Sequence, residues 1–325
     1  MVRRSHFLRS LLALAASGLL SSTLLAADAW PSKPIRLVVP YPPGGSSDII
    51  ARSIGQLISQ ELKQTVVIDN KPGANGNLGA EFVARAPADG YTWLLCDLGA
   101  LAISPSIYTK LSFDPSKALR GAAMLAYSPH MLVVHPSVQA SNLKELVELS
   151  KKQDLNFAVT ASGSAPHLAG VELARITGAK WVYVPYKGGV QSVQDTVAGQ
   201  TQVLMNGMLA TYPHVQSGKL KLLGISKNTR MPLIADVPTL AEQGAQGFAS
   251  GTWQGVVLPA KTPEAVVQRV NQVLLAAIRS TEVRSRLTGQ GAEVVTMTPA
   301  ETDKFFNAER ARWRAVVQAA QLQLD

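Results

Sequence analysis

The stretch Val38-Val39-Pro40-Tyr41-Pro42-Pro43-Gly44-Gly45-Ser46-Ser47-Asp48 decides the fold. It begins at the end of an apolar run, Ile35 to Val39, and apolar residues then recur at helical spacing from Ile50 to Leu62. The pattern predicts a strand, a glycine-rich turn and the first turn of a helix. Free backbone N–H groups, the positive end of the helix dipole and two serine hydroxyls would together bind an anion. Taken alone, the stretch also fits a plain turn with a serine N-cap.

A second stretch repeats this arrangement further along the chain. The predicted strand Leu155 to Thr160 leads into Ala161-Ser162-Gly163-Ser164-Ala165-Pro166-His167, and a helix follows as far as Gly178. Around both stretches predicted strands and helices alternate, which indicates parallel sheets with right-handed crossovers. We therefore predict an α/β protein of two lobes whose two anion-binding turns face each other across one cleft. Such a pair suits a guest with two anionic ends, or with one carboxylate and one polar end.

The segment between the two lobes has a less regular pattern. Residues 101–119 are interrupted by Pro105 and Pro115 and are expected to be irregular. The apolar runs 122–127 and 131–135 each predict a strand, and the second is expected to carry the chain into the next lobe.

The connection between the lobes is predicted to be ordered. No linker rich in Gly, Ser or Pro interrupts the chain, and Phe248 to Leu258 predicts an extended segment that returns toward the first lobe. We therefore assign residues 30–130 and 253–325 to lobe 1 and residues 131–252 to lobe 2, with crossover strands between them.

Residues 1–29 have the pattern of a cleavable secretory signal peptide. Arginines at positions 3, 4 and 9 precede the small apolar residues of Leu11 to Leu25, and Ala27-Asp28-Ala29 offers a cleavage site. An uncleaved anchor is the alternative, but the apolar run is short for a membrane span. No later stretch is apolar enough to cross a membrane, so we expect a soluble, exported chain.

The composition excludes several classes of protein. An apolar fraction of 46% and a charged fraction of 16% suit a folded protein rather than a disordered one. The net charge is +9, but the basic residues are scattered and no basic stripe with aromatic residues predicts nucleic-acid binding. Cys96 is the single cysteine of the sequence, so an internal disulfide is excluded.

The sequence offers few groups for catalysis. Its five histidines lack metal-binding spacing, and its turn serines lack the G-x-S-x-G elbow. Asp48 and Asp97 could form an acid–base pair, although Asp48 in a first helical turn also suits the helix dipole. Cys96 and His167 are more easily explained as packing residues than as a nucleophile and a base. We therefore expect no enzyme activity, no cofactor and no metal.

Several short motifs occur in a fixed order over the whole chain after residue 29. They are Trp30-Pro31, Lys33-Pro34-Ile35-Arg36, Gly44-Gly45 with Asp48, Asn70-Lys71-Pro72-Gly73-Ala74, Gly76-Asn77, Gly79, Pro87, Asp89-Gly90-Tyr91-Thr92, His167-Leu168-Ala169-Gly170, Val184-Pro185-Tyr186-Lys187-Gly188, Gly218-Lys219-Leu220 and Asp236-Val237-Pro238-Thr239. In this order they resemble the Bug family, the TctC-like periplasmic substrate-binding proteins of tripartite tricarboxylate transporters.

The resemblance implies a type II periplasmic binding protein, which closes two lobes over a small carboxylate. The expected guests are di- or tricarboxylates, amino acids or aromatic acids. The expected partners are membrane components of a tripartite tricarboxylate transporter, or a sensor, and the protein is expected to be a monomer in the periplasm. The ligand contacts that the resemblance implies are Tyr41, Gly44, Gly45, Ser46, Ser47 and Asp48 in lobe 1, Ser162, Gly163, Ser164 and His167 in lobe 2, and Pro185, Tyr186 and Lys187 on the floor.

The chain departs from the family pattern at positions that touch the cleft. Asp97 follows Cys96 where small residues or threonine are common, and Asn206 stands where Asp is common. We include Asp97 and Asn206 among the expected ligand contacts, and the second turn, 160–166, looks shorter than usual. Two other hypotheses stay open: a secreted enzyme on this scaffold that uses Cys96, Asp97 or His167, and an interaction protein without a small ligand.

Overall fold

The computed structural model describes residues 30–319 and 321–324. The predicted signal peptide therefore lies outside the described residues. The chain divides into a short unit, Met1–Ser32, and a large unit, Lys33–Asp325. The large unit contains all the helices and strands of the described residues.

The first half of the sheet is built on three parallel strands. They lie in the order β2 (Val66–Asn70), β1 (Ile35–Val39) and β3 (Thr92–Cys96). Next to β3 lies β9 (Gly251–Pro259), which is antiparallel and pairs in turn with β4 (Leu119–Val134). β10 (Glu293–Val294) also pairs with β4. Every residue of β1 except Arg36 is buried, as expected for a central parallel strand.

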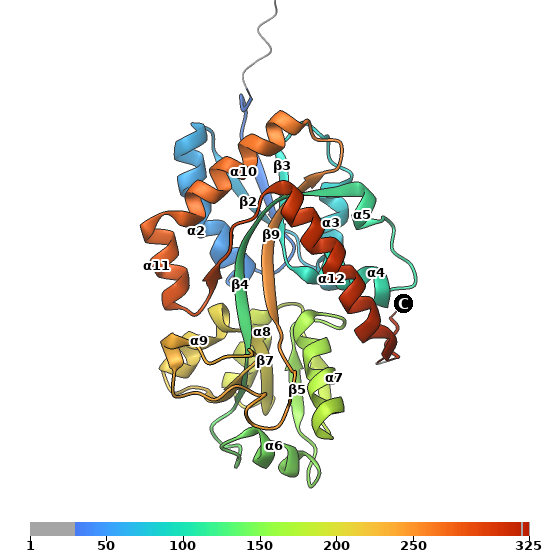
Figure 1. Ribbon diagram of the computed structural model, residues 1–325, viewed down its shortest axis with the longest axis vertical. Coiled ribbons are helices and arrows are strands. Elements are labelled where there is room, and N and C mark those ends of the chain that lie inside the picture. The colour runs from blue at the N-terminus through green and yellow to red at the C-terminus, as the bar shows by residue number, and fades with distance from the viewer. Residues whose placement is uncertain (1–29, 320, 325) are drawn as a thin grey trace, which may run out of the picture. The chain divides into compact units, whose positions relative to one another are not determined.

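The second half of the sheet begins on the same strand β4. Its last residues, 130–134, pair antiparallel with β7 (Val203–Gly207), and residues 131–134 pair with β8 (Lys221–Ile225). Parallel to β7 lies β5 (Asn156–Val159), followed by β6 (Val182–Pro185). β4 and β9 thus run from one lobe toward the other (Figure 1).

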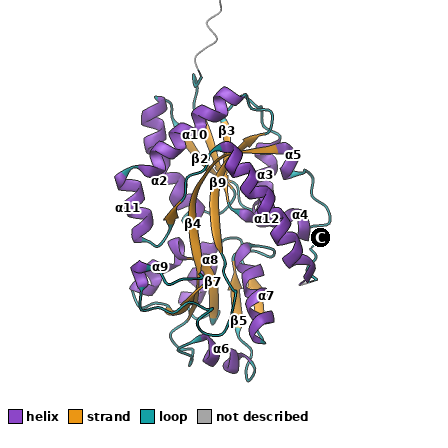
Figure 2. Cartoon of the chain, in the orientation of Figure 1, coloured by secondary structure: helices purple, strands orange, loops and turns teal. Residues whose placement is uncertain are grey.

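Helices flank both parts of the sheet (Figure 2). With the first lobe are α2 (Ser46–Leu62), η1 (Ala74–Gly76), α3 (Asn77–Ala84), η2 (Gly99–Ile103), α4 (Ser104–Ile107), α5 (Pro115–Ala118), α10 (Glu264–Arg279), α11 (Thr281–Gly289) and α12 (Pro299–Ala319). With the second are α6 (Leu143–Ser150), α7 (Ala165–Thr177), α8 (Gly189–Val197), α9 (Met208–Gln216) and η3 (Pro232–Ile234). The α/β, two-lobed architecture predicted from the sequence is confirmed, and the residue boundaries of the lobes stay a prediction.

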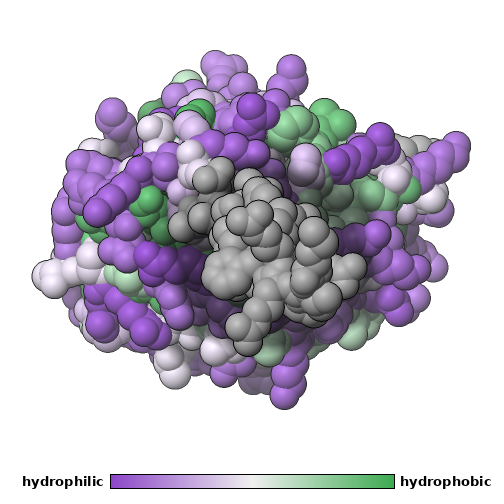
Figure 3. Space-filling view, turned by 90° about the horizontal axis from the view of Figure 1, so that it is seen from above, coloured by the Kyte–Doolittle hydropathy of each residue, from purple (hydrophilic) through white to green (hydrophobic). Residues whose placement is uncertain are grey.

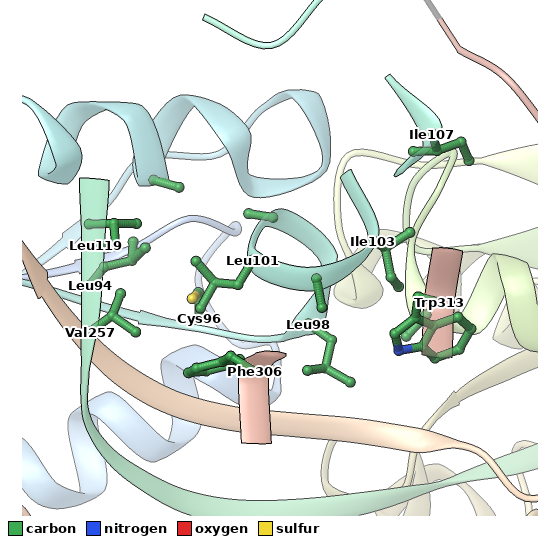
Figure 4. Close-up of a cluster of buried hydrophobic side chains, with 14 of the residues drawn as sticks. Leu94, Cys96, Leu98, Leu101, Ile103, Ile107, Leu119, Val257, Phe306 and Trp313 are labelled. Carbon is green, nitrogen blue, oxygen red and sulfur yellow. The ribbon is translucent and has the colours of Figure 1, made fainter. Parts of the chain in front are cut away.

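The hydrophobic core of the first lobe surrounds the end of β3. Cys96, Leu98 and Leu101 are buried there with Phe306 and Trp313 of α12 (Figure 4). Burial raises the pKa of the Cys96 thiol well above its usual value, with a smaller contribution from the neighbouring carboxyl of Asp97. The thiol is therefore a packing group, as the sequence suggested.

The segment between the lobes differs from the sequence prediction. The two strands predicted at 122–127 and 131–135 are one strand, β4, because it keeps pairing first with β9 and then with β7 and β8. Residues 101–119, expected to be irregular, contain α4 and α5. Pro105 and Pro115 lie in the first turns of these helices, where a missing N–H group costs nothing.

The face seen from above carries polar residues with scattered apolar ones (Figure 3). Within the described residues, no helix combines the length and the apolar character needed to cross a membrane.

Candidate functional site

A small cavity lies where elements of both lobes meet, and we call it the central cavity. Its volume is about 40 Å³, and one water needs at least about 10–15 Å³, so it holds only a few water-sized atoms. The lining residues are Tyr41, Pro42, Gly45, Ser46, Ser47, Asp97, Thr160, Pro166, Gly189, Asn206, Ala210, Thr252 and Gln254.

Four helices begin at the central cavity. Ser46 and Ser47 open α2, Pro166 lies in the first turn of α7, Gly189 opens α8 and Ala210 lies in the first turn of α9. No side chain caps α2 or α8 among the described residues, whereas Ser164 caps α7 and the Ser128 hydroxyl accepts from the Leu209 N–H at the start of α9. The first N–H groups and positive dipole ends of these helices favour a negative charge in the cavity.

Two buried amide side chains in the cavity wall have atoms without a protein partner. Gln254 of β9 is fully buried, and among the described residues neither its Oε1 nor its Nε2 forms a hydrogen bond. Asn206 at the end of β7 is 6% exposed and its Nδ2 is likewise unpaired, while its Oδ1 accepts a 3.4 Å bond from Thr160. Because a buried unpaired polar group costs about 1–3 kcal/mol, both amides indicate a place for a polar guest.

Asp97 is the one charged side chain among the residues that line the cavity. Its Oδ1 accepts hydrogen bonds from the Tyr41 hydroxyl and the Gly99 N–H, both at 2.7 Å. Burial raises the pKa of Asp97, and these two bonds lower it to a smaller extent. Burial, followed by the charge of Asp97, raises the pKa of Tyr41 well above its usual value, so Tyr41 is a neutral donor.

Asp48 shapes the first turn rather than lining the cavity. Its Oδ2 accepts bonds from the Gly44 N–H at 2.9 Å and from Arg52 at 2.8 Å, and its Oδ1 accepts from Asn70 at 3.0 Å. Burial opposes ionisation, but these bonds outweigh it and lower the pKa of Asp48. The carboxylate thereby holds Gly44 at a φ of 86°, which glycine adopts without strain.

The second turn is held by its own side chains. Ser164 accepts from the N–H of His167, and the N–H of Gly163 donates to His167 Nδ1 at 3.0 Å. The ring of His167 packs edge-on against Tyr183, and burial lowers its pKa to about 4. Of the contacts predicted in this turn, Gly163, Ser164 and His167 do not line the central cavity.

A second, more open space of about 520 Å³, the outer pocket, shares Tyr41 with the central cavity. Ser162, Pro185, Tyr186 and Lys187 line it, together with Tyr108 and the segment 72–76. Burial first, and then Asp195, raise the pKa of Tyr186 to about 12. The structure thus divides most of the predicted contacts between two spaces, with Tyr41 common to both. Five of them line neither space: Gly44, Asp48, Gly163, Ser164 and His167.

Both predicted turns border the central cavity, the first through Gly45, Ser46 and Ser47 and the second through Pro166. A Cβ atom added to Gly44 would lie 3.5 Å from Val190, and one added to Gly188 would lie 2.5 Å from Pro42, so the first turn meets the start of α8. The second turn instead meets the first lobe at Asn75, whose Nδ2 donates to the Gly163 carbonyl at 2.9 Å.

The sequence profile of a family described as the tripartite tricarboxylate transporter family receptor matches residues 50–322. The chain belongs to this receptor family. This receptor chain is 33% identical over 297 residues to Protein BugT of Bordetella pertussis. The matched region covers 90% of this chain and 91% of BugT.

Two solved structures resemble the receptor closely. The periplasmic binding protein BugD has a TM-score of 0.87 at 30% identity, over 90% of this chain and 99% of BugD. MatC from Rhodopseudomonas palustris with bound malate has a TM-score of 0.83 at 31% identity, over 89% of this chain and 100% of MatC. The resemblance to the Bug family inferred from the motifs is confirmed.

Sequence reasoning missed part of the receptor's cavity wall. Thr160 and Gly189 line the cavity just after predicted strands, but they are not among the predicted contacts. Gln254 and Thr252 lie in the segment 248–258, which was predicted only as an extended return. A glutamine inside an otherwise apolar strand was the available signal, because a buried amide needs a partner.

Proposed function

We propose that this receptor is a periplasmic solute-binding protein that encloses a small carboxylate between its two lobes. The observation that carries the proposal is the central cavity, where unpaired amides of Gln254 and Asn206 meet the starts of four helices. The bound malate of MatC supports the same class of guest.

The guest's carboxylate would be held by dipoles rather than by a salt bridge. No Lys, Arg or His is among the residues that line the cavity, but backbone N–H groups of α2 and the hydroxyls of Ser46 and Ser47 are available. Hydrogen bonds to a charged group contribute about 1.5–3 kcal/mol each, so a few suffice for useful affinity.

Entry of the guest requires the lobes to part. The cavity is lined by elements of both lobes, and contacts such as that between Asn75 and Gly163 join the lobes. We infer that β4 and β9, which run through both lobes, bend to open and close the site. Closure would then bury the guest and complete its hydrogen bonds.

The finer parts of the proposal concern location and partners. We infer that residues 1–29 are removed on export to the periplasm, and that the closed, monomeric receptor delivers its guest to the membrane components of a tripartite tricarboxylate transporter or to a sensor. Enzyme activity is the weaker candidate. Cys96 is buried with a raised pKa, and His167 is bonded within its own turn.

A thermal-shift panel of mono-, di- and tricarboxylates, amino acids and aromatic acids tests the proposal. Ligand at a hundred times its Kd adds about 2.7 kcal/mol to the free energy of unfolding. We expect a clear shift with at least one acid, and none with its methyl ester. If no acid stabilises the ligand-free protein, the proposal is wrong and the interaction-protein hypothesis takes its place.

A further inference from the structure

We propose that the central cavity selects a carboxylate that also carries an ammonium group, a zwitterionic amino acid, and that Asp97 binds this ammonium. The inference rests on the proposed function, and it narrows the class of guest. It excludes simple di- and tricarboxylates as the preferred ligands.

The cavity wall carries a negative charge, and none of its described residues supplies a positive side chain to balance it. Asp97 is its one charged side chain, and no Lys, Arg or His stands among the lining residues to balance it. The titratable groups against it, Tyr41 and Cys96, are both neutral because burial raises their pKa values. A carboxylate that is withdrawn from water without a counter-ion is costly, so a cationic group of the guest would stabilise the closed state.

Within the part of the chain that the structure describes, only one of the two carboxyl oxygens of Asp97 accepts hydrogen bonds from other residues. Both hydrogen bonds that fix the side chain go to Oδ1, one from the Tyr41 hydroxyl and one from the Gly99 N–H. Among the described residues no group of another residue donates to Oδ2, so this oxygen of a residue that lines the cavity can accept a bond from the guest. An ammonium group, which has three donors and no acceptor, matches it.

Different groups of the cavity wall supply the hydrogen-bond donors and the charged acceptor. The uncapped starts of α2 and α8 present N–H groups and positive dipole ends that suit a carboxylate. Asp97 offers the acceptor. The unpaired amide atoms of Gln254 and Asn206 offer the guest further buried hydrogen-bond partners in the cavity wall. A guest with a second carboxylate at Asp97 would instead place two negative charges in a cavity of about 40 Å³.

Matched pairs of guests test the inference without any mutation. Isothermal titration of the ligand-free protein at neutral pH compares L-alanine with propionate, L-aspartate with succinate and L-glutamate with glutarate. Each pair differs only in the ammonium group. We expect the amino acid of at least one pair to bind about tenfold or more tightly than its partner, which is the typical value of one charge-assisted bond.

Two variants then test whether Asp97 causes the preference for the amino acid. Asp97→Asn keeps the shape and removes the charge, and is expected to abolish the preference for the amino acid. Asp89→Asn, on the surface in an ion pair with Lys33, serves as the matched control and is expected to keep it.

The outcomes separate this inference from the proposed function. Equal or tighter binding of the deaminated acid in every pair overturns the inference, although the solute-binding proposal stands. An unchanged preference in Asp97→Asn also overturns it. Failure of both members of every pair to bind overturns the inference, and the thermal-shift panel then decides the proposed function separately. If Asp97→Asn does not fold, the paired titrations of the wild-type protein still decide.

Discussion

At the scale of single residues, the amide of Gln254 shows most clearly that the fold reserves space for a guest. It is fully buried in β9 and neither amide atom bonds to a described residue, so both need a partner from outside the protein. Groups of this kind are retained where function requires them, at the expense of stability.

The variant Gln254→Leu should therefore separate stability from binding. Removing the unpaired amide is expected to raise the free energy of unfolding of the ligand-free protein by about 1 kcal/mol, and to weaken ligand binding. The same change at Gln243 should destabilise, because that amide bonds to the Leu143 N–H and the Leu223 carbonyl. Urea unfolding and calorimetric titration measure both effects. A loss of stability in Gln254→Leu would contradict the account.

His130 predicts how stability depends on pH. Burial lowers its pKa to about 3, and its ring is bonded to Ser250 and Thr252. An unfolded histidine takes up a proton below about pH 6.5, whereas native His130 stays neutral, so stability is complete above that pH and falls as the pH drops. The expected loss from this residue is about 2 kcal/mol at pH 5.

Unfolding by urea between neutral pH and pH 5 measures this loss. His167, with its lowered pKa, adds to it in the same direction. The variant His130→Gln should be less stable at neutral pH but should show a flatter pH dependence. An unchanged slope would contradict the assignment.

At the scale of secondary-structure elements, the caps distinguish structural helix starts from those that face the guest. Ser164 caps α7 through the N–H of His167, whereas α2 and α8 begin without a side-chain cap among the described residues. We expect Ser164→Ala to reduce the free energy of unfolding by about 1 kcal/mol, the usual value of an N-cap.

Thermal unfolding of Ser164→Ala checks this prediction, and Ser217→Ala provides the control. Ser217 follows the end of α9 and its hydroxyl forms one exposed bond, so its loss should change little. If both variants lose the same free energy of unfolding, Ser164 does not stabilise α7 as an N-cap.

The elements also show what a sequence can predict. The strand β1, the first turn and the apolar stripe of α2 were predictable, because each follows from neighbouring residues. The single strand β4 was not, since its continuity depends on pairing with β9 and β7, which come far later in the chain. For the same reason the glutamine in β9 could mark a buried amide but not the cavity that it lines, whereas Ser46 in the first turn and Asp97 after β3 were predictable.

At the scale of the whole molecule, the contact between the first turn and the start of α8 indicates that the described state is closed. Gly188 has an extended backbone that any residue adopts, but an added Cβ would lie 2.5 Å from the ring of Pro42. The variant Gly188→Ala should therefore oppose closure without straining its own backbone.

We expect Gly188→Ala to weaken ligand affinity about tenfold or more, because less of the protein reaches the closed state. Gly289→Ala is the control, since no atom lies within 4 Å of its added Cβ. Small-angle X-ray scattering should show a larger radius of gyration for Gly188→Ala with ligand than for wild type. Identical curves would contradict the role of this contact.

Isothermal titration of the ligand-free protein tests the central claim most directly, using the carboxylate with the largest thermal shift. The account predicts one site per chain, a negative heat-capacity change from closure, and loss of binding with the methyl ester of the same compound. Full affinity for the ester, or no binding of any carboxylate, would contradict it.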